Sequence, residues 1–438
     1  MNVLGIETSC DETAVAVVRD GRRILSSVVA SQMAEHARFG GVVPEVAARR
    51  HVEAINTVVR AALREAGITA REIDLIAVTN RPGLLGALLV GVAAAKAMAM
   101  ALDVPLIGIH HIEAHLYANF LTPAGAESPQ SEADFPAVAL VVSGGHTDLF
   151  HLRGHGDYRL LGRTRDDAAG EAFDKCARLM GLPYPGGPAI QEAARSGDPR
   201  AVKLPRAYLP DTYEFSFSGL KTAVRNVLHG TTNKGSVVSG QWSVDREHGI
   251  GIRSGGENPG DDAPPPTPST AETQSAGTGR SAIPRTQHPA QRKRSQPERD
   301  VPRFREPNTQ HSGNAVSRNG TFRDSANPTP SLPDLAASFQ EAVVDVLVRK
   351  TVAAARDTGV ERVFLAGGVA ANARLRERMG AACDAAGLRL FYPPPALCTD
   401  NGAMIAAAGF FYHESGRGMG DLALTAVPSE PLALLLPP

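Results

Sequence analysis

The chain has 438 residues, and 43% of them are hydrophobic, so it is long enough for two domains with sizeable cores. A net charge of −1 excludes a protein whose overall charge binds nucleic acid, so any RNA contact must come from a local patch or a partner. The four cysteines form no CxxC pair, and the first residues lack a basic stretch followed by an apolar run. We therefore expect a soluble, cytoplasmic protein with reduced cysteines and no membrane partner.

Strands and helices are predicted to alternate over the first third of the chain. Asp20-Gly21 is typical of a hairpin turn, and Gly67 follows a helical pattern that starts at Pro44. The apolar helix at 85–101 contains Lys96 and many alanines, which favours a buried helix over a membrane span. The expected strands are 3–6, 14–19, 24–29, 74–79 and 106–110, and the expected helices are 44–66 and 85–101. This order predicts a mixed α/β sheet.

A similar order restarts near residue 136. A hairpin across Gly144-Gly145 is followed by two helices, and a later helix–strand–helix stretch continues the same lobe. The expected strands are 137–142, 147–152, 158–162 and 363–366, and the expected helices are 168–180, 188–195, 335–356 and 370–386. Two successive hairpin-plus-helix modules indicate an internal duplication.

Hydrophobic periodicity is lost between residues 229 and 333, where Gly, Pro, Ser, Thr, Arg and Gln predominate. This composition predicts a disordered, low-complexity insertion, in which the Arg292-Lys293-Arg294 cluster is better explained as solvated charge than as an RNA contact. We expect a first lobe, a second lobe in two parts whose last helix can pack on the first lobe, the insertion and a C-terminal tail. Their ranges are 1–135, 136–228 with 334–412, 229–333 and 413–438.

Three loops after strands combine small, hydroxylated or acidic residues. The first, residues 7–13, contains Asp11 and Glu12, which can help to organise a cation or a phosphate. The second, residues 141–147, and the third, which ends at Asn372, each place two glycines after an apolar strand. An ordinary polar turn explains each loop singly. Three such loops in a duplicated α/β chain indicate a site for phosphate and adenosine, with Asn372 free to hydrogen-bond the base.

A histidine pair predicts a metal site. His111 and His115 are four residues apart, so both rings project from one face of a helix. The third ligand that such a pair needs is best supplied by Asp400, whose alternative role is to cap the last helix. A zinc-protease motif is excluded, because Glu113 lies one residue beyond the position of the general base and about 100° around the helix.

A further acidic stretch precedes a glycine-rich turn. Asp166 or Asp167 is predicted to cap the helix that follows, and that helix carries Asp174. A charged, solvent-facing helix would explain the stretch equally well. Alternatively, Asp174 can accept hydrogen bonds from a ribose or an amino-acid group, and Gly187 can allow a ligand to approach closely.

Nine motifs resemble the TsaD family of tRNA N(6)-adenosine threonylcarbamoyltransferases, in family order from residue 1 to about 412. They are GIETSCDETAVAVV, GGVVPEVAARRH, HHIEAHLYA, VVSGGHTDL, DDAAGEAFDK, YPGGP, FSFSGLKTAV, LAGGVAANARLR and CTDNGAMIAAAG. The resemblance implies the two-lobed actin/sugar-kinase/Hsp70 fold, a duplicated RNase H-like architecture. The sequence departs from the family in the long insertion and in Phe39, where tyrosine is usual.

The resemblance also implies an activity and its residues. The family transfers threonylcarbamoyl from threonylcarbamoyl-AMP to the adenosine beside the anticodon of tRNA, with a TsaB-like paralogue and a TsaE-like ATPase as partners. It implies one divalent metal, iron or zinc, on His111, His115 and Asp400. Asp11 and Glu12 match acidic residues near the phosphates and are the candidate catalytic residues. The expected substrate-binding positions are Val141, Val142, Ser143, Gly144, Gly145, Asp174, Gly187 and Asn372.

Two other functions are compatible with the fold. A small-molecule kinase would also bind ATP between the lobes, but it needs no histidine pair, so the metal content discriminates between the two. A non-catalytic chaperone or scaffold would keep the fold and lose the metal ligands, whose presence favours an enzyme.

Overall fold

The computed structural model describes residues 1–123, 133–230, 330–417, 422–430 and 432. All of them belong to one unit that excludes residues 235–324. Nearly all of the predicted insertion at 229–333 therefore lies outside the described residues, as does the cluster Arg292-Lys293-Arg294.

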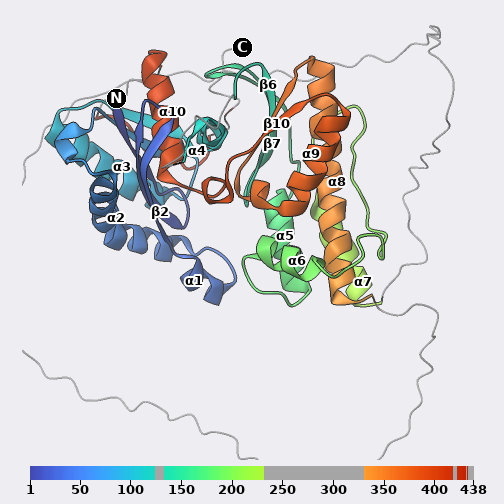
Figure 1. Ribbon diagram of the computed structural model, residues 1–438. Coiled ribbons are helices and arrows are strands. Elements are labelled where there is room, and N and C mark those ends of the chain that lie inside the picture. The colour runs from blue at the N-terminus through green and yellow to red at the C-terminus, as the bar shows by residue number, and fades with distance from the viewer. Residues whose placement is uncertain (124–132, 231–329, 418–421, 431, 433–438) are drawn as a thin grey trace, which may run out of the picture. The chain divides into compact units, whose positions relative to one another are not determined.

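The first sheet has the strand order β3-β2-β1-β4-β5 (Figure 1). Its central strand β1 pairs antiparallel with β2 and parallel with β4. Side chains alternate along a strand, so Leu4 and Ile6 face helices α2 and α3, whereas Val3 faces helix α10. The bounds are β1 Asn2–Glu7, β2 Glu12–Arg19, β3 Arg23–Ser31, β4 Leu75–Arg81, β5 Leu106–His110, α1 Met33–His36, α2 Pro44–Ala66, α3 Leu85–Leu102, α4 His111–Tyr117 and α10 Gly402–Glu414.

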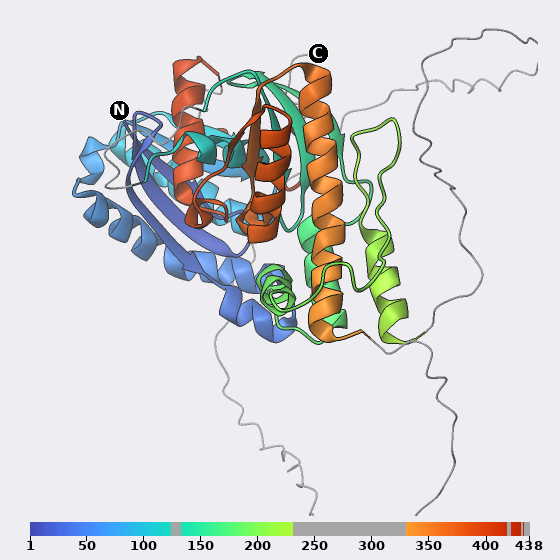
Figure 2. The same ribbon diagram turned by 45° about the vertical axis from the view of Figure 1, so that its right-hand side comes forward.

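The second sheet repeats this topology with the order β10-β9-β6-β7-β8. Strand β6 again pairs antiparallel with its hairpin partner β7 and parallel with β9, and Figure 2 shows the long helix α8 beside α9. The predicted duplicated α/β fold is therefore confirmed. The bounds are β6 Ala137–Val142, β7 Thr147–Gly154, β8 Asp157–Arg163, β9 Arg362–Ala366, β10 Arg389–Phe391, α5 Ala169–Leu179, α6 Gly186–Ala194, α7 Ser218–Leu228, α8 Leu332–Thr358 and α9 Ala373–Ala385.

Short 3-10 helices connect several of these elements. One of them, η4, replaces the first turn of the helix expected at 370–386, and α9 starts only after it. The bounds are η1 Ala37–Phe39, η2 Ala70–Glu72, η3 Ala118–Phe120, η4 Gly368–Ala371 and η5 Pro395–Leu397.

Helix α3 differs from its prediction as a buried helix. Only one of its faces is buried, where it packs on β4 and α2, while Leu85, Leu89 and Met100 are exposed on the outside. Among the described residues it is the one helix long and apolar enough to cross a membrane. Its packing on β4 and α2 makes it part of the first lobe.

The predicted capping role of Asp166 is also corrected. Helix α5 begins after Ala168, which makes no side-chain cap. The carboxylate of Asp166 instead accepts hydrogen bonds from the backbone N–H of Phe217 (2.8 Å) and Ser218 (3.2 Å), and from the Ser218 hydroxyl (2.7 Å). Asp166 therefore caps α7, a helix about fifty residues later, and Asp167 pairs with Lys175 at 2.6 Å.

Candidate active site

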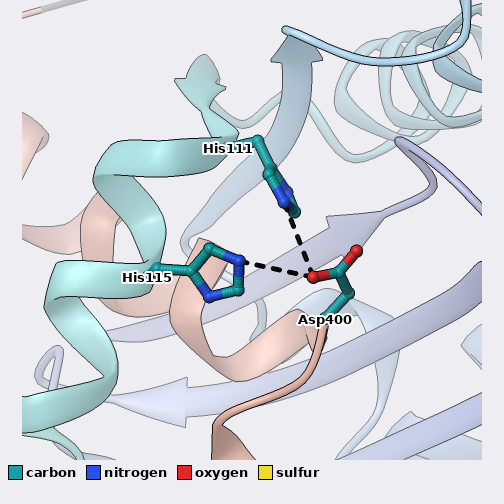
Figure 3. A group of neighbouring side chains, drawn as sticks. All are labelled: His111, His115 and Asp400. Atoms are coloured by element: carbon teal, nitrogen blue, oxygen red, sulfur yellow. Dashed lines mark ion pairs between the residues drawn. The ribbon is translucent and has the colours of Figure 1, made fainter. Parts of the chain in front are cut away.

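The histidine pair and Asp400 meet beside the first sheet. His111 opens α4 directly after β5, and His115 follows one turn later on the same face. Figure 3 shows both rings pointing at the Asp400 carboxylate. Asp400 Oδ1 lies 3.5 Å from His111 Nε2 and 3.4 Å from His115 Nε2. The structure therefore brings together the three residues predicted to share an ion.

Asp400 does not cap helix α10. The N-cap is Asn401, whose side chain accepts a hydrogen bond from Met404 N–H at 2.9 Å. The capping role that competed with metal binding is thus taken by the neighbouring residue, and the Asp400 carboxylate faces the histidines.

The chemistry of the three side chains fits a divalent metal. Ligands bound about 2.0–2.1 Å from a tetrahedral ion lie roughly 3.3 Å from one another, close to the two distances between nitrogen and Asp400 Oδ1. His115 is fully buried, and neither of its ring nitrogens has a hydrogen-bond partner in the described part of the chain. An unpartnered buried imidazole is costly, and coordination of an ion would satisfy it.

Glu7 supports the cluster from behind, a role that the sequence analysis did not assign. Its Oε2 lies 3.1 Å from His111 Nδ1 and accepts a hydrogen bond from the Thr79 hydroxyl at 2.6 Å, while its Oε1 accepts one from Ser9 N–H. A proton held on Nδ1 leaves Nε2 free to bind an ion. Burial lowers the pKa of His111, but the carboxylates of Asp400 and Glu7 outweigh it and raise that pKa to about 9. The cluster therefore favours positive charge.

We predict that Glu7→Gln lowers metal affinity by about 10- to 100-fold, the usual effect of losing such a supporting carboxylate. The amide places a donor where Ser9, Thr79 or His111 already donates. Competition with a chromogenic chelator measures the affinity. Glu113→Gln is the matched control, because Glu113 is also buried but accepts a hydrogen bond from Tyr412, not from a histidine. Equal affinities of the two variants would remove Glu7 from the metal site.

A pocket of about 350 Å³ adjoins this cluster. Asp400 belongs to both the cluster and the pocket wall. The predicted site residues that line the pocket are Asp11, Glu12, Ser143, Gly144, Asp174, Gly187, Asn372 and Asp400. Tyr184 and Gln191 also line it and were not predicted; Tyr184 belongs to the YPGGP motif, which was the available signal.

Three of the predicted substrate-binding positions do not line this pocket. Val141 and Val142 are buried within β6, whereas Gly145 lines a smaller, second pocket. The two glycines of the β6–β7 turn therefore belong to different pockets, with Gly144 on the larger one.

The amide of Asn372 is not free, as was expected. Its oxygen caps α9 by accepting from Leu375 N–H at 3.0 Å, and its nitrogen donates to Gln340 Oε1 at 2.9 Å. Helix α9 begins at Ala373, so its first turn needs this cap. Asn372 therefore shapes the pocket wall with its amide already engaged.

The carboxylates in the pocket are held in uncharged-favouring surroundings. Burial raises the pKa of Asp174, whose Oδ1 accepts a hydrogen bond from Gly186 N–H at 2.7 Å. Burial, followed by repulsion from Asp400 and Asp11, raises the pKa of Glu12 to about 9. An added cation or a ligand bearing donors would relieve this crowding of negative charge.

The duplicated lobes and the glycine-turn pocket beside a histidine–carboxylate cluster define a nucleotide-binding protein of the actin/sugar-kinase/Hsp70 fold. The family model described as TsaD, tRNA N6-adenosine threonylcarbamoyltransferase, matches residues 23–407. The chain belongs to this family, and acyl transfer in tRNA modification is its class of activity.

Relatives support the assignment along nearly the whole chain. The tRNA N6-adenosine threonylcarbamoyltransferase of Symbiobacterium thermophilum is 47% identical over 97% of this chain and 95% of its own. Those of Thermomicrobium roseum and Geobacillus thermodenitrificans are 46% and 44% identical, over 95% and 98% of this chain and 93% and 96% of their own. Among solved structures, HypF from T. kodakarensis is 15% identical with a TM-score of 0.49, over 97% of this chain and 49% of its own.

Proposed function

We propose that the chain transfers threonylcarbamoyl from threonylcarbamoyl-AMP to the exocyclic N6 amine of the adenosine next to the anticodon, in tRNAs that read codons beginning with A, and releases AMP. The observation that carries this proposal is the position of Asp400, which belongs both to the histidine cluster and to the wall of the larger pocket. A donor whose adenylate fills that pocket would have its acyl group next to the cluster.

The reaction makes one bond and breaks one. The N6 nitrogen attacks the carbonyl carbon of the donor, the bond from that carbon to the phosphate oxygen breaks, N6 loses a proton and AMP departs with the bond's electron pair. Backbone N–H groups of the turn after β6 are placed to receive the phosphate, as Ser143 and Gly144 line the pocket. Asp11 and Glu12 lie in the same wall and are the candidates to receive the proton.

One divalent ion per subunit is proposed on His111, His115 and Asp400. Two imidazoles and one carboxylate are a ligand set found with Fe²⁺, and zinc accepts the same donors. We assign Fe²⁺, with Zn²⁺ as the alternative. When bound there, the ion would polarise the carbonyl oxygen of the donor.

A TsaB-like paralogue and a TsaE-like ATPase are proposed as partners in the cytoplasm. The exposed apolar residues of the first lobe gather on two helices that pack together, with Val52 on α2 and Leu85, Leu89 and Met100 on α3. Clustered exposed apolar side chains are typical of a protein interface. A partner that covers this face would also explain how a chain of net charge −1 can engage RNA.

The test is the nucleoside content of tRNA. Cells depleted of this protein should lose threonylcarbamoyladenosine from their tRNA, as measured by mass spectrometry of digested tRNA, and re-expression should restore it. A purified system supplied with threonylcarbamoyl-AMP should form the same nucleoside. Unmodified levels in depleted cells, together with phosphorylation of a small molecule in vitro, would favour the kinase alternative.

A further inference from the structure

A second pocket of about 230 Å³ lies across the β6–β7 turn from the first. Gly144 lines the larger pocket and Gly145 lines this one. His110 and Ile112, which flank the cluster residue His111 in sequence, also line it. The histidine–carboxylate cluster is therefore bordered by two pockets, one through Asp400 and the other through the neighbours of His111.

The second pocket contains polar groups without hydrogen-bond partners. His110 is fully buried and its Nε2 lies 2.8 Å from the carbonyl oxygen of Glu430, so Nε2 carries the proton and Nδ1 of the neutral ring is an acceptor. Neither His110 Nδ1 nor Arg163 Nε, both buried, has a hydrogen-bond partner among the described residues. Arg163 Nε lies 3.6 Å from Asp148 Oδ1. The pocket thus offers both an acceptor and a donor to a ligand.

We propose that this second pocket receives the adenine base of the acceptor tRNA, an inference that rests on the proposed function. Adenine presents an amine donor beside ring-nitrogen acceptors, which complements His110 Nδ1 and Arg163. Proteins that recognise single-stranded RNA loops hold splayed-out bases by their edges, and enzymes that modify a base take it out of the stack. The volume is below the roughly 300–1,000 Å³ of small-molecule sites, which suits one base better than a whole nucleotide.

The arrangement also meets a geometric need of the reaction. Acceptor and donor must bring the reacting atoms to about 3–3.5 Å from each other. A base held on the far side of the β6–β7 turn can reach the carbonyl at the cluster without displacing the adenylate from the larger pocket. The competing explanation is a space beneath the C-terminal segment that binds nothing, because Ser429, Glu430 and Leu432 form part of the wall.

The turn offers a matched pair of variants, Gly145→Phe and Gly144→Phe. A side chain added at either glycine meets no atom within 4 Å, and neither glycine has a positive φ, so both variants should fold. Each introduces a bulky ring at only one pocket. AMP affinity by calorimetry, metal content and the KM for an anticodon stem-loop with saturating donor are measured for both.

Gly145→Phe is expected to raise the stem-loop KM or lower kcat by about tenfold or more, equivalent to roughly 1.4 kcal/mol, with AMP affinity and metal content unchanged. Gly144→Phe is expected to weaken AMP binding. A stem-loop with 8-azidoadenosine at the acceptor position should crosslink to peptides that contain residues 157–165 or 422–432. An unchanged stem-loop KM in Gly145→Phe, or crosslinks confined to peptides of the larger pocket, would overturn the proposal. A wild-type protein that modifies no tRNA would instead overturn the proposed function.

Discussion

Replacing His111 or His115 by alanine is expected to reduce threonylcarbamoyl transfer to background while the protein stays folded. Each substitution removes one of the three ligands that lie within 4.8 Å of one another, and no other described His, Cys, Asp or Glu belongs to this group of ligands. Removing a buried imidazole that has no hydrogen-bond partner, as in His115, also breaks no hydrogen bond. Transfer is measured by nucleoside mass spectrometry, metal content by plasma mass spectrometry and folding by circular dichroism.

His229→Ala is the control for these two variants, since His229 is exposed at the end of α7. It should retain both metal and activity. If both cluster variants transferred the acyl group at the wild-type rate, the ion would have no part in the mechanism.

The substitution Gly5→Ala is expected to lower the free energy of unfolding by about 3 kcal/mol, at the upper end of overpacking costs. A Cβ at Gly5 would lie 2.1 Å from the backbone oxygen of Gly402 and 2.5 Å from Ala406 N, and the backbone of α10 cannot rotate away as a side chain can. Because Asp400 immediately precedes this helix, a displaced α10 should also weaken metal binding. Urea denaturation and chelator competition measure the two effects.

Gly380→Ala is the matched control, because Gly380 lies within α9 and an added Cβ meets nothing within 4 Å. Replacing a helical glycine by alanine should stabilise the protein by up to about 1 kcal/mol. Equal stabilities of Gly5→Ala and the wild type would show that α10 is not fixed by its close contact with β1.

Local sequence patterns were sufficient to predict most of the fold. Proline and glycine mark the start and end of α2, which spans Pro44–Ala66 as expected, and the apolar runs of β5 and β6 were predicted with the observed bounds. These elements are determined by chemistry that lies within one short segment. The exposed face of α3 could not be predicted, since its residues are apolar all round and composition alone does not distinguish a core from an interface.

The candidate site divides along the same line. The spacing of His111 and His115 is a local property, and so their shared face was predictable. The contact of Glu7 with His111 joins residues 104 positions apart, and the cap that Asp166 gives to α7 spans about fifty, so no local pattern reveals either. The assignments of Asn372 and Asp400 depended on which residue caps a helix, and each helix start offers several side chains that can do so.

Metal content and transfer rate measured on one sample test the account most directly. Purified protein is stripped of metal by a chelator, supplied with threonylcarbamoyl-AMP, tRNA and its partners, and then titrated with Fe²⁺ or Zn²⁺. We predict that the stripped protein still binds AMP but transfers nothing, and that one equivalent of ion per chain restores transfer. Full transfer by protein that contains no metal would contradict the account.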